Sequence, residues 1–235
     1  MMTTLSAGLA LLVAQGNSIQ SYVQNGFRDV SLTARVQSGN QRELTKISKD
    51  FGFSYRFSYT NLSVKEPFRF RAESMLDDTK LTVIQNGMTE KFNTPIYHGT
   101  QNLSKAPGRV HTPLELGILT PSMFDDFMTA RFVRMDRATG NAVFDITFVP
   151  RLDDTSRFRV WIDPQKKYTT RREWYGQGKG NLKATFIYDE PREFNGVWLP
   201  TRSSVRNADN IAAGSLTYQN VKVNQDLSDA LFKVK

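Results

Sequence analysis

The sequence supplies few of the side chains that enzymes use for nucleophilic, acid–base or metal chemistry. It contains no cysteine and only two histidines, His98 and His111, which excludes thiol catalysis, disulfides and cysteine-ligated metals. Both histidines lie in loop-like sequence between Pro95 and Pro113, where a structural role is the more common one. We therefore predict no catalytic residue, no metal site and no cofactor.

Neither the paired carboxylates nor the glycine-rich segment of the chain predicts an active site. Asp125-Asp126 and Asp153-Asp154 are adjacent in sequence, and neighbouring side chains on a helix or strand do not converge on one point. Residues 176–180 (Gly-Gln-Gly-Lys-Gly) lack the Gly-Lys-Ser/Thr ending of a phosphate loop, so a hairpin loop is the better interpretation. We expect a protein that is not an enzyme, with a hydrolase only as a third alternative.

The aromatic residues are the more informative feature of the sequence. Sixteen Phe, eight Tyr and three Trp make up 11% of the 235 residues, and many of them alternate with polar residues, as in half-buried strands. Asn195-Gly196 is typical of a two-residue hairpin turn, and short connections of this kind indicate an antiparallel meander. Alternation predicts strands at 30–36, 51–59, 68–72, 144–148, 158–162, 168–175, 184–188, 197–205 and 216–223.

Helices are expected at only a few places. Residues 41–50 have the apolar spacing of a short amphipathic helix. Thr112-Pro113 and Thr120-Pro121 are typical N-cap and N1 pairs that begin helices. The second of these predicted helices carries a wide apolar stripe of two Met and two Phe side chains within 123–128. The sequence thus predicts a mainly β fold in which a few helices cover the apolar face of one long sheet.

Such a sheet should curl around whatever it covers, and a wide or partly open one leaves a cavity. Aromatic side chains facing Met- and Phe-bearing helices would suit an apolar ligand. The alternative is that these side chains simply fill the core, and periodicity by itself favours that alternative.

Positive charge is concentrated in one part of the chain. Residues 131–183 hold twelve basic and six acidic residues and so supply most of the net charge of +8. Arg157 and Arg159 alternate with Phe158 and Val160, which indicates that the excess charge lies on the solvent-facing side of the sheet. A solvated face is the commonest outcome, attraction to an anionic membrane surface comes next, and nucleic-acid binding is least expected, because RNA-binding sheets carry aromatic and basic residues on the same face.

The first charged residue of the chain is Arg28. Residues 5–14 are apolar and match a signal-peptide hydrophobic region in length, but they are too few to span a bilayer. No Lys or Arg precedes them, so 1–16 are interpreted either as an export signal or as an apolar first helix. Residues 17–235 are predicted to form a single domain.

Four segments, taken together, resemble a known family. Residues 62–73 are similar to its early strand, Lys-x-Pro, strand segment, and 83–87 to a short hairpin. The block 158–200 and the ending 221–232, with its Asp-x-Leu-Phe sequence, follow in the same order. This order and spacing resemble the outer-membrane lipoprotein-sorting proteins (LolA/LolB-like), and the resemblance covers roughly 28–235.

The resemblance implies a strongly curved, unclosed antiparallel β half-barrel with a few helices on its concave face. It implies a periplasmic or otherwise exported, soluble and monomeric protein that shields the acyl chains of lipoproteins or lipids. Phe70 matches an aromatic residue whose counterpart lines the cavity. In the carrier branch the residue before the matching Pro is an Arg that latches the helical lid, and Glu66 stands there in this chain.

Two functions remain open at this point. The first is a carrier that holds acyl chains in an aromatic-lined cavity. The alternative is an envelope-stress sensing or interaction module on the same fold, which binds an envelope partner protein and keeps the cavity filled by its own side chains. The candidate cavity-lining residues are Phe53, Tyr55, Phe57, Phe68, Phe70, Met123, Phe124, Phe127, Met128, Phe144, Ile146, Phe148, Phe158 and Val160.

Overall fold

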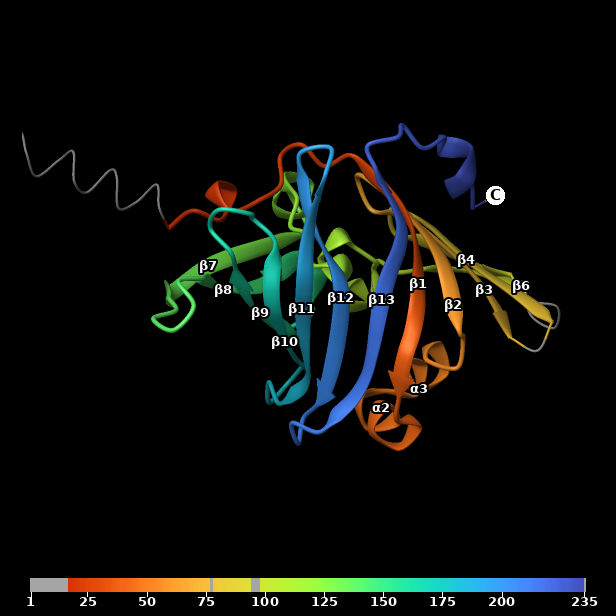
Figure 1. Ribbon diagram of the computed structural model, residues 1–235, viewed down its shortest axis with the longest axis horizontal. Helices are drawn as coiled ribbons and strands as arrows, with labels where there is room; N and C mark the ends of the chain where they lie inside the picture. Colours follow the sequence, from red (N-terminus) through yellow and green to blue (C-terminus); the bar gives the residue numbers. More distant parts are fainter. Residues whose placement is uncertain (1–16, 77, 94–97, 235) are drawn as a thin grey trace, which may run out of the picture.

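The computed structural model describes residues 17–76, 78–93 and 98–234. Its strands form one antiparallel sheet in the order β6-β5-β4-β3-β2-β1-β13-β12-β11-β10-β9-β8-β7 (Figure 1). The edge strands β6 and β7 lie at opposite ends of this order, so the sheet stays open. The predicted fold class, a mainly β, unclosed antiparallel half-barrel with a few helices on the concave face, is confirmed.

The first and last strands of the chain pair in the middle of the sheet, with Val30 opposite Val223. One wing therefore comes from the N-terminal half of the chain and the other from the C-terminal half. The N-terminal wing contains β1 (Asp29–Gly39), β2 (Tyr59–Lys65), β3 (Arg69–Leu76), β4 (Thr79–Asn86), β5 (Thr89–Asn93) and β6 (His98–Asn102). The C-terminal wing contains β7 (Met128–Met135), β8 (Ala142–Phe148), β9 (Arg157–Ile162), β10 (Thr169–Tyr175), β11 (Leu182–Phe194), β12 (Val197–Asn207) and β13 (Ala212–Val223).

Short turns join most neighbouring strands. Phe194 and Val197 are paired across the predicted Asn195-Gly196 turn, and both turn residues have positive φ (49° and 77°), as a two-residue hairpin of this type requires. The exception is the long connection from β6 to β7, which has to reach from one edge of the sheet to the other.

Two α-helices, α2 (Gln41–Ile47) and α3 (Lys49–Ser54), follow β1. Asn40 and Ser48 cap them, each side chain accepting a hydrogen bond from a backbone N–H three residues on. Leu44 and Ile47 pack against β11, β12 and β13 on the concave side. The helix predicted over 41–50 is thus confirmed over its first seven residues.

The strand predicted over 51–59 is wrong, because α3 and a turn occupy this segment and the next strand begins at Tyr59. Its Phe-Gly-Phe-Ser-Tyr alternation also fits a helix, since Phe51 and Tyr55 are four residues apart and lie on one helical face. The N-cap at Ser48 decides in favour of the helix, and Phe51 packs against Phe186 with ring centroids 5.8 Å apart.

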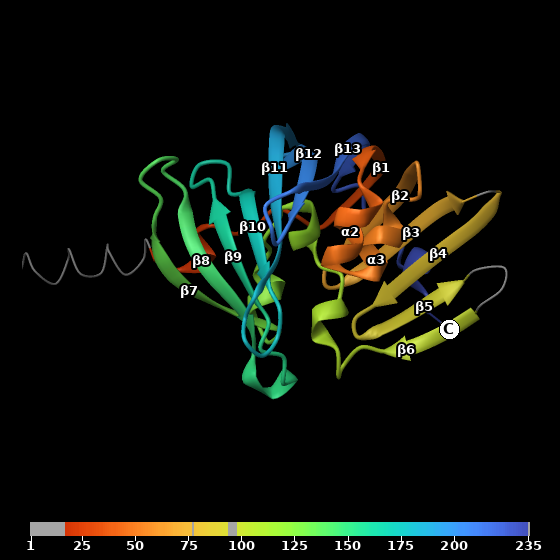
Figure 2. The same cartoon turned by 90° about the horizontal axis from the view of Figure 1, so that it is seen from below.

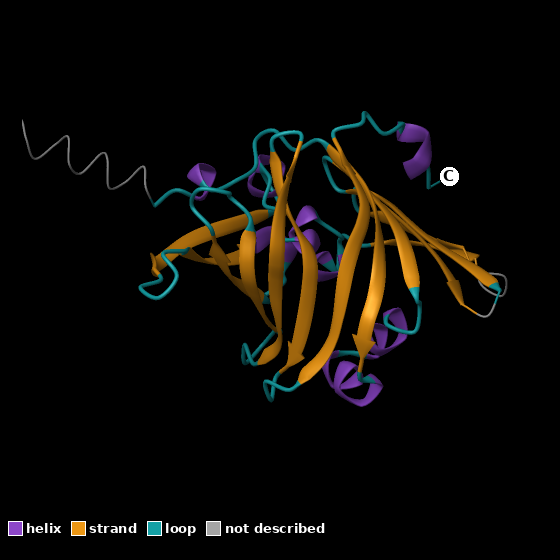
Figure 3. Ribbon diagram, viewed as in Figure 1, coloured by secondary structure: helices purple, strands orange, loops and turns teal. Residues whose placement is uncertain are grey.

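The remaining helices are short 3₁₀ turns, drawn in purple with α2 and α3 in Figure 3. Pro113 and Pro121 do begin helices at the predicted positions, but η4 ends at Phe124 and Met128 already belongs to β7. The apolar stripe over 123–128 is therefore divided between a 3₁₀ turn and a strand. The 3₁₀ helices are η1 (Ile19–Ser21), η2 (Pro107–Arg109), η3 (Pro113–Leu116), η4 (Pro121–Phe124), η5 (Pro150–Leu152) and η6 (Asp229–Phe232).

Figure 2 shows the two wings bent towards each other, with α2, α3 and the β6–β7 connection lying between them on the concave side. Phe144 and Val160 of the C-terminal wing are completely buried there. Tyr22 and Val23 pack in the same core cluster, so the segment before β1 also covers the inner face. The export signal or first helix expected over 1–16 lies outside the described residues.

Basic residues gather on the convex face of the C-terminal wing around one carboxylate. Asp145 is only 5% exposed, and it accepts hydrogen bonds from Arg157 (2.7 Å), Arg159 (2.8 Å) and Arg131 (3.2 Å). Burial alone would raise the pKa of Asp145, but the hydrogen bonds and charges of Arg159 and Arg157 outweigh it and lower that pKa. The prediction that Arg157 and Arg159 point away from the inner face is confirmed, although both are half-buried in this ion-pair network.

Candidate ligand-binding face

The connection from β6 to β7, residues 103–127, crosses the concave face and carries η2, η3 and η4 (Figure 2); we call it the plug. Most of its buried apolar side chains face the C-terminal wing, whereas Leu116 and Ile118 belong to the core cluster under the centre of the sheet. Leu114, Leu119, Met123 and Phe127 are all buried in the core cluster that contains Phe144 and the inner faces of β8 and β9.

Ten of the fourteen candidate cavity residues come together where the plug packs against the C-terminal wing. Seven are buried in this core cluster: Met123, Phe127, Met128, Phe144, Ile146, Phe148 and Val160. Phe68, Phe124 and Phe158 pack against it as partly buried neighbours. In this structure these side chains fill the inner face of the C-terminal wing.

The other four candidates lie elsewhere. Phe70 belongs to the core cluster under the centre of the sheet. Phe53 is 44% exposed on α3 and packs edge-on against Phe57, with ring centroids 5.1 Å apart. Tyr55 is half-buried and lies over Gly214, where a Cβ would clash with the tyrosine ring. It therefore covers β13 rather than joining the cluster beneath the plug.

The inner face of the N-terminal wing is less completely covered. The register places Leu62, Ala72, Val83 and Phe92 opposite one another on β2, β3, β4 and β5. All four side chains are partly exposed, whereas Phe144, Ile146 and Val160 on the inner face of the C-terminal wing are completely buried. They form a continuous apolar row on the concave side, which we call the wing row.

A polar contact set fixes the plug to this wing. Gln85 donates to the carbonyl oxygen of His111 (3.1 Å) and accepts from its N–H (2.8 Å). The imidazole of His111 stacks on Phe70 at 4.0 Å between ring centroids. Its Nδ1 lies 3.0 Å from Glu115, and its Nε2 lies 3.6 Å from Glu90.

Burial would lower the pKa of His111, but the charges and hydrogen bonds of Glu115 and Glu90 outweigh it and raise the pKa to about 10. The imidazole is therefore a cation at neutral pH, held between two carboxylates. The four-residue spacing of His111 and Glu115 was readable in the sequence. Glu90 gave no such signal, because only the pairing of β4 with β5 brings it near.

The C-terminal wing holds the plug mainly through its backbone. Thr169 N–H donates to the carbonyl oxygen of Gly117 (2.8 Å), and Ile118 lies opposite Tyr168 in an isolated antiparallel bridge. Gly117 has φ +77°, and a Cβ there would meet Tyr188 and Pro200 at 3.2 Å. The crossing is thus closest at Gly117, where a side chain would be both strained and crowded.

Glu66, which replaces the latch arginine expected from the family resemblance, also contacts the plug. One carboxylate oxygen accepts a hydrogen bond from the Ser122 hydroxyl, and the other is buried without a partner. Burial raises the pKa of Glu66. In this chain the plug is therefore held at this position by a buried carboxyl group.

Arg172 is a charged side chain of the inner face that the sequence reasoning missed. It stands on β10 between Val160 of β9 and Phe186 of β11 and is only 8% exposed. The expectation that the basic residues of 131–183 lie on the solvent-facing side is wrong for Arg172, because the pleat of β10 points it inward while Arg171 points outward. Its guanidinium carbon lies 4.1 Å from the ring centroid of Phe186.

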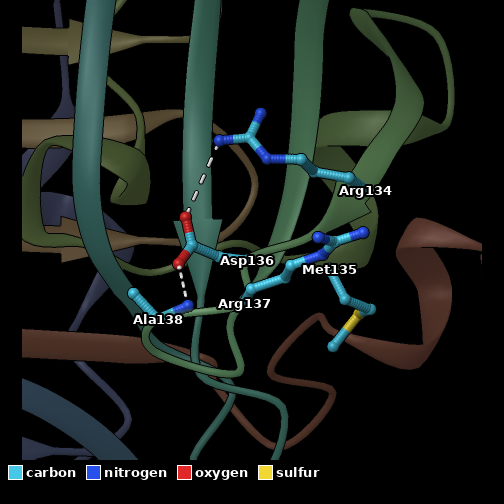
Figure 4. A pocket seen from close by; sticks show the side chains of 5 residues that line it. All are labelled: Arg134, Met135, Asp136, Arg137 and Ala138. Carbon is cyan, nitrogen blue, oxygen red and sulfur yellow. Dashed lines mark hydrogen bonds and ion pairs between the residues drawn. The ribbon is translucent and has the colours of Figure 1, made fainter.

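A separate depression lies beside the β7–β8 turn, lined by Arg134, Met135, Asp136, Arg137 and Ala138 (Figure 4). Asp136 accepts hydrogen bonds from the indole of Trp161 (3.1 Å) and the N–H of Ala138 (3.0 Å). These contacts, the Trp161 bond first, lower the pKa of Asp136. The carboxylate is occupied in shaping the turn, so the depression shows no assembled chemistry.

No group of three or more His, Asp or Glu side chains within the described ranges is placed to hold a metal ion. Among the helices of those same ranges, none combines the length and the apolar character that a membrane span needs.

Solved structures share this fold over nearly the whole chain. A LolA superfamily protein from Nitrosomonas europaea superposes with a TM-score of 0.62 at 13% identity, covering 91% of this chain and 93% of its own. A domain from Vibrio parahaemolyticus, described as an outer membrane lipoprotein-sorting protein, gives 0.59 at 11% identity and 95% coverage of both chains. The LolA/LolB-like recognition is confirmed as a likeness of fold.

A DUF1329 family protein from Desulfovibrio piger is similar to the same extent, with a TM-score of 0.58 at 13% identity and coverage of 98% and 97%. A family model whose description reads "-like: Uncharacterized protein" matches residues 120–235, which contain the C-terminal wing. No curated protein matches the sequence.

Glu66→Gln should stabilise the protein at neutral pH. The amide can still accept from Ser122 but removes a buried charge, so we expect a gain of about 1 kcal/mol in the free energy of unfolding at pH 7. Because the folded-state pKa of Glu66 is raised, the wild type should lose stability as the pH rises from about 4.5 towards that raised value. The variant should lack this part of the pH dependence.

Urea unfolding at a series of pH values measures both effects. Ser122→Ala is the matched control, because it removes the hydrogen-bond donor and should destabilise the protein. A Glu66→Gln variant that is less stable than the wild type at pH 7 would contradict this assignment.

His111→Gln should destabilise the protein by about 2 kcal/mol, the usual scale for hydrogen bonds to charged groups. Because the pKa of His111 is raised to about 10, the stabilisation is complete below about pH 6.5 and is lost progressively as the pH rises through 10. The difference between wild type and variant should shrink over that window. The exposed His98 provides the control, since His98→Gln should leave the unfolding curve unchanged; equal losses in the two variants would refute the role of His111.

Proposed function

We propose that the protein is an exported, non-enzymatic carrier that binds the acyl chains of lipids or lipoproteins on the concave face of its half-barrel. The observation that carries this proposal is the wing row of Leu62, Ala72, Val83 and Phe92, which offers partly exposed apolar surface on the inner side of an open sheet. The likeness of fold to a domain described as a lipoprotein-sorting protein supports the same direction.

The energetics suit a long chain. Each buried CH₂ contributes about 0.8 kcal/mol, so a chain of ~16 carbons supplies roughly 13 kcal/mol before the cost of ordering it. The wing row crosses only four strands, which is too short a surface for the whole chain. A chain of that length also needs the apolar surface between the plug and the C-terminal wing, where ten of the candidate cavity residues lie.

Binding would therefore move the plug. Its core-facing side chains include Met123, and Met128 follows at the start of β7. Methionine adapts its shape to different neighbours, so these residues can repack around an acyl chain and close again after release. The side-chain contacts that tie the plug to the N-terminal wing, from Gln85 to His111 and from Glu66 to Ser122, can break and re-form, and the acyl chain would cover the apolar side chains that the plug leaves.

A ligand should remain bound through gentle purification. We expect native mass spectrometry of the protein to show retained lipid, and a 16-carbon fluorescent fatty acid to bind and to be displaced by that lipid. A ligand-free spectrum together with no probe binding would overturn the carrier function and would favour the interaction module that keeps its inner face filled.

A covalent lock tests whether the plug has to move. Ile118 and Tyr168 lie opposite each other in an antiparallel bridge, a geometry in which Cα atoms are close enough for a disulfide, and the chain has no cysteine of its own. We expect the oxidised Ile118→Cys/Tyr168→Cys protein to bind the fatty acid probe at least tenfold more weakly, and reduction to restore binding.

The two single-cysteine variants are the controls for lost packing at Ile118 and Tyr168. If the oxidised protein binds as tightly as the reduced one, the acyl chain enters without displacing this part of the plug, and the role given to the plug is wrong.

A further inference from the structure

Arg172 is a buried cation without a counter-ion inside the described part of the chain. It makes no ion pair there, and its buried Nε atom has no hydrogen-bond partner. Its guanidinium instead faces aromatic rings, those of Phe186 (4.1 Å) and Phe158 (5.8 Å). Buried arginines in proteins are normally paired with a carboxylate, so this side chain is the exception that requires an explanation.

Packing does not explain the choice of arginine. The residues opposite Arg172 on the two neighbouring strands are Val160 and Phe186, and an apolar side chain in this position would complete their row. A charge held in apolar surroundings destabilises the folded protein unless something compensates it. The arrangement is therefore suited to a charge that arrives from outside the chain.

The groups around Arg172 are suited to a polar head group. Tyr188 and Tyr218 lie on the same inner face of β11 and β13, with their hydroxyls bonded to the Leu114 carbonyl oxygen (3.2 Å) and the Ser203 hydroxyl (3.1 Å). Trp174, two residues on from Arg172, is partly exposed and stacks on Phe51 of α3 with ring centroids 6.5 Å apart. Solvent therefore reaches the concave face beside the arginine.

The nearest acidic group on the plug is already engaged. Glu115 acts on Arg172 only through its longer-range charge, and its carboxylate oxygens lie 3.0 Å from the imidazole of His111. The side chain of Glu115 is 42% exposed, so it does not close the inner face. The Tyr188 hydroxyl lies within hydrogen-bonding reach of Arg172, but it is neutral, so the charge of the guanidinium has no anionic partner among the described residues.

We propose that Arg172 binds the anionic head group, a carboxylate or a phosphate, of the amphiphile whose acyl chain lies on the concave face. A planar guanidinium presents paired N–H donors that match either group. This inference rests on the proposed function, because it names the chemistry at one end of the same ligand. It also gives the ligand a direction, with its head beside β10 and α3 and its chain running beneath the plug towards the wing row.

Three amphiphiles with one chain length test the proposal: dodecanoate, dodecyl phosphate and dodecanol. The wild type should bind at least one of the two anions ten or more times tighter than dodecanol, measured by displacement of a fluorescent fatty acid or by calorimetry. The two anionic arms separate a carboxylate head group from a phosphate one.

Arg172→Met should remove the preference for the anion while leaving dodecanol binding within twofold. Its urea midpoint should equal or exceed that of the wild type, because the variant replaces an unpaired buried charge by an apolar side chain. Arg172→Lys keeps the charge without the planar pair of donors and should bind the anions less tightly than the wild type; it also keeps the test open if the methionine variant does not fold. Arg171→Met, the same change one residue along on the convex face, is the control and should leave all three affinities unchanged.

The possible failures can be told apart. A wild type that binds none of the three amphiphiles overturns the proposed function and this inference with it. A wild type that binds all three equally well, or an Arg172→Met variant that keeps the anion preference, overturns this inference alone and leaves the carrier function standing.

Discussion

The structure depends on one requirement, that the inner face of an open sheet has to be covered although its two edges never meet. A closed barrel fills itself with its own side chains, whereas an open one needs other segments to cover its apolar side. Here a single connection, the plug, reaches from edge to edge. Most of its buried apolar side chains face the C-terminal wing, two lie under the centre of the sheet, and the wing row stays partly exposed. The inner face of the C-terminal wing is thus covered more completely than that of the N-terminal wing.

The contacts that hold the plug differ between the C-terminal wing and the N-terminal wing. Towards the C-terminal wing it is buried and makes backbone hydrogen bonds at Gly117. Towards the other wing it depends on side-chain contacts of Gln85, His111 and Glu66. Hydrogen bonds of this kind fix the position of the plug without burying much apolar surface. Arg172 adds a charge on the same face that the chain itself does not neutralise.

Much of the fold was predictable because alternation reports directly which strand face is apolar. That signal located β1, β3 and most of the C-terminal wing. It failed at 51–59, where an alternating aromatic segment also satisfies a helix and only the Ser48 cap decides. The site was less predictable, because Glu90 and His111 meet only through strand pairing, and because Arg172 stands within a basic segment whose other arginines point outward. The composition gives the number of charged residues, but the pleat of each strand determines which of their side chains point towards the inner face.

The pairing of β1 with β13 at the centre of the sheet has a consequence for how the protein folds. Val30 and Val223 are partners, so the middle of the sheet cannot form until nearly the whole described chain is available. Contacts between residues so distant in sequence slow folding, since a long loop has to close before they form. Each wing can begin as local hairpins, but joining them waits for the last strand. The sheet of this chain can therefore be completed only after its last strand has been synthesised.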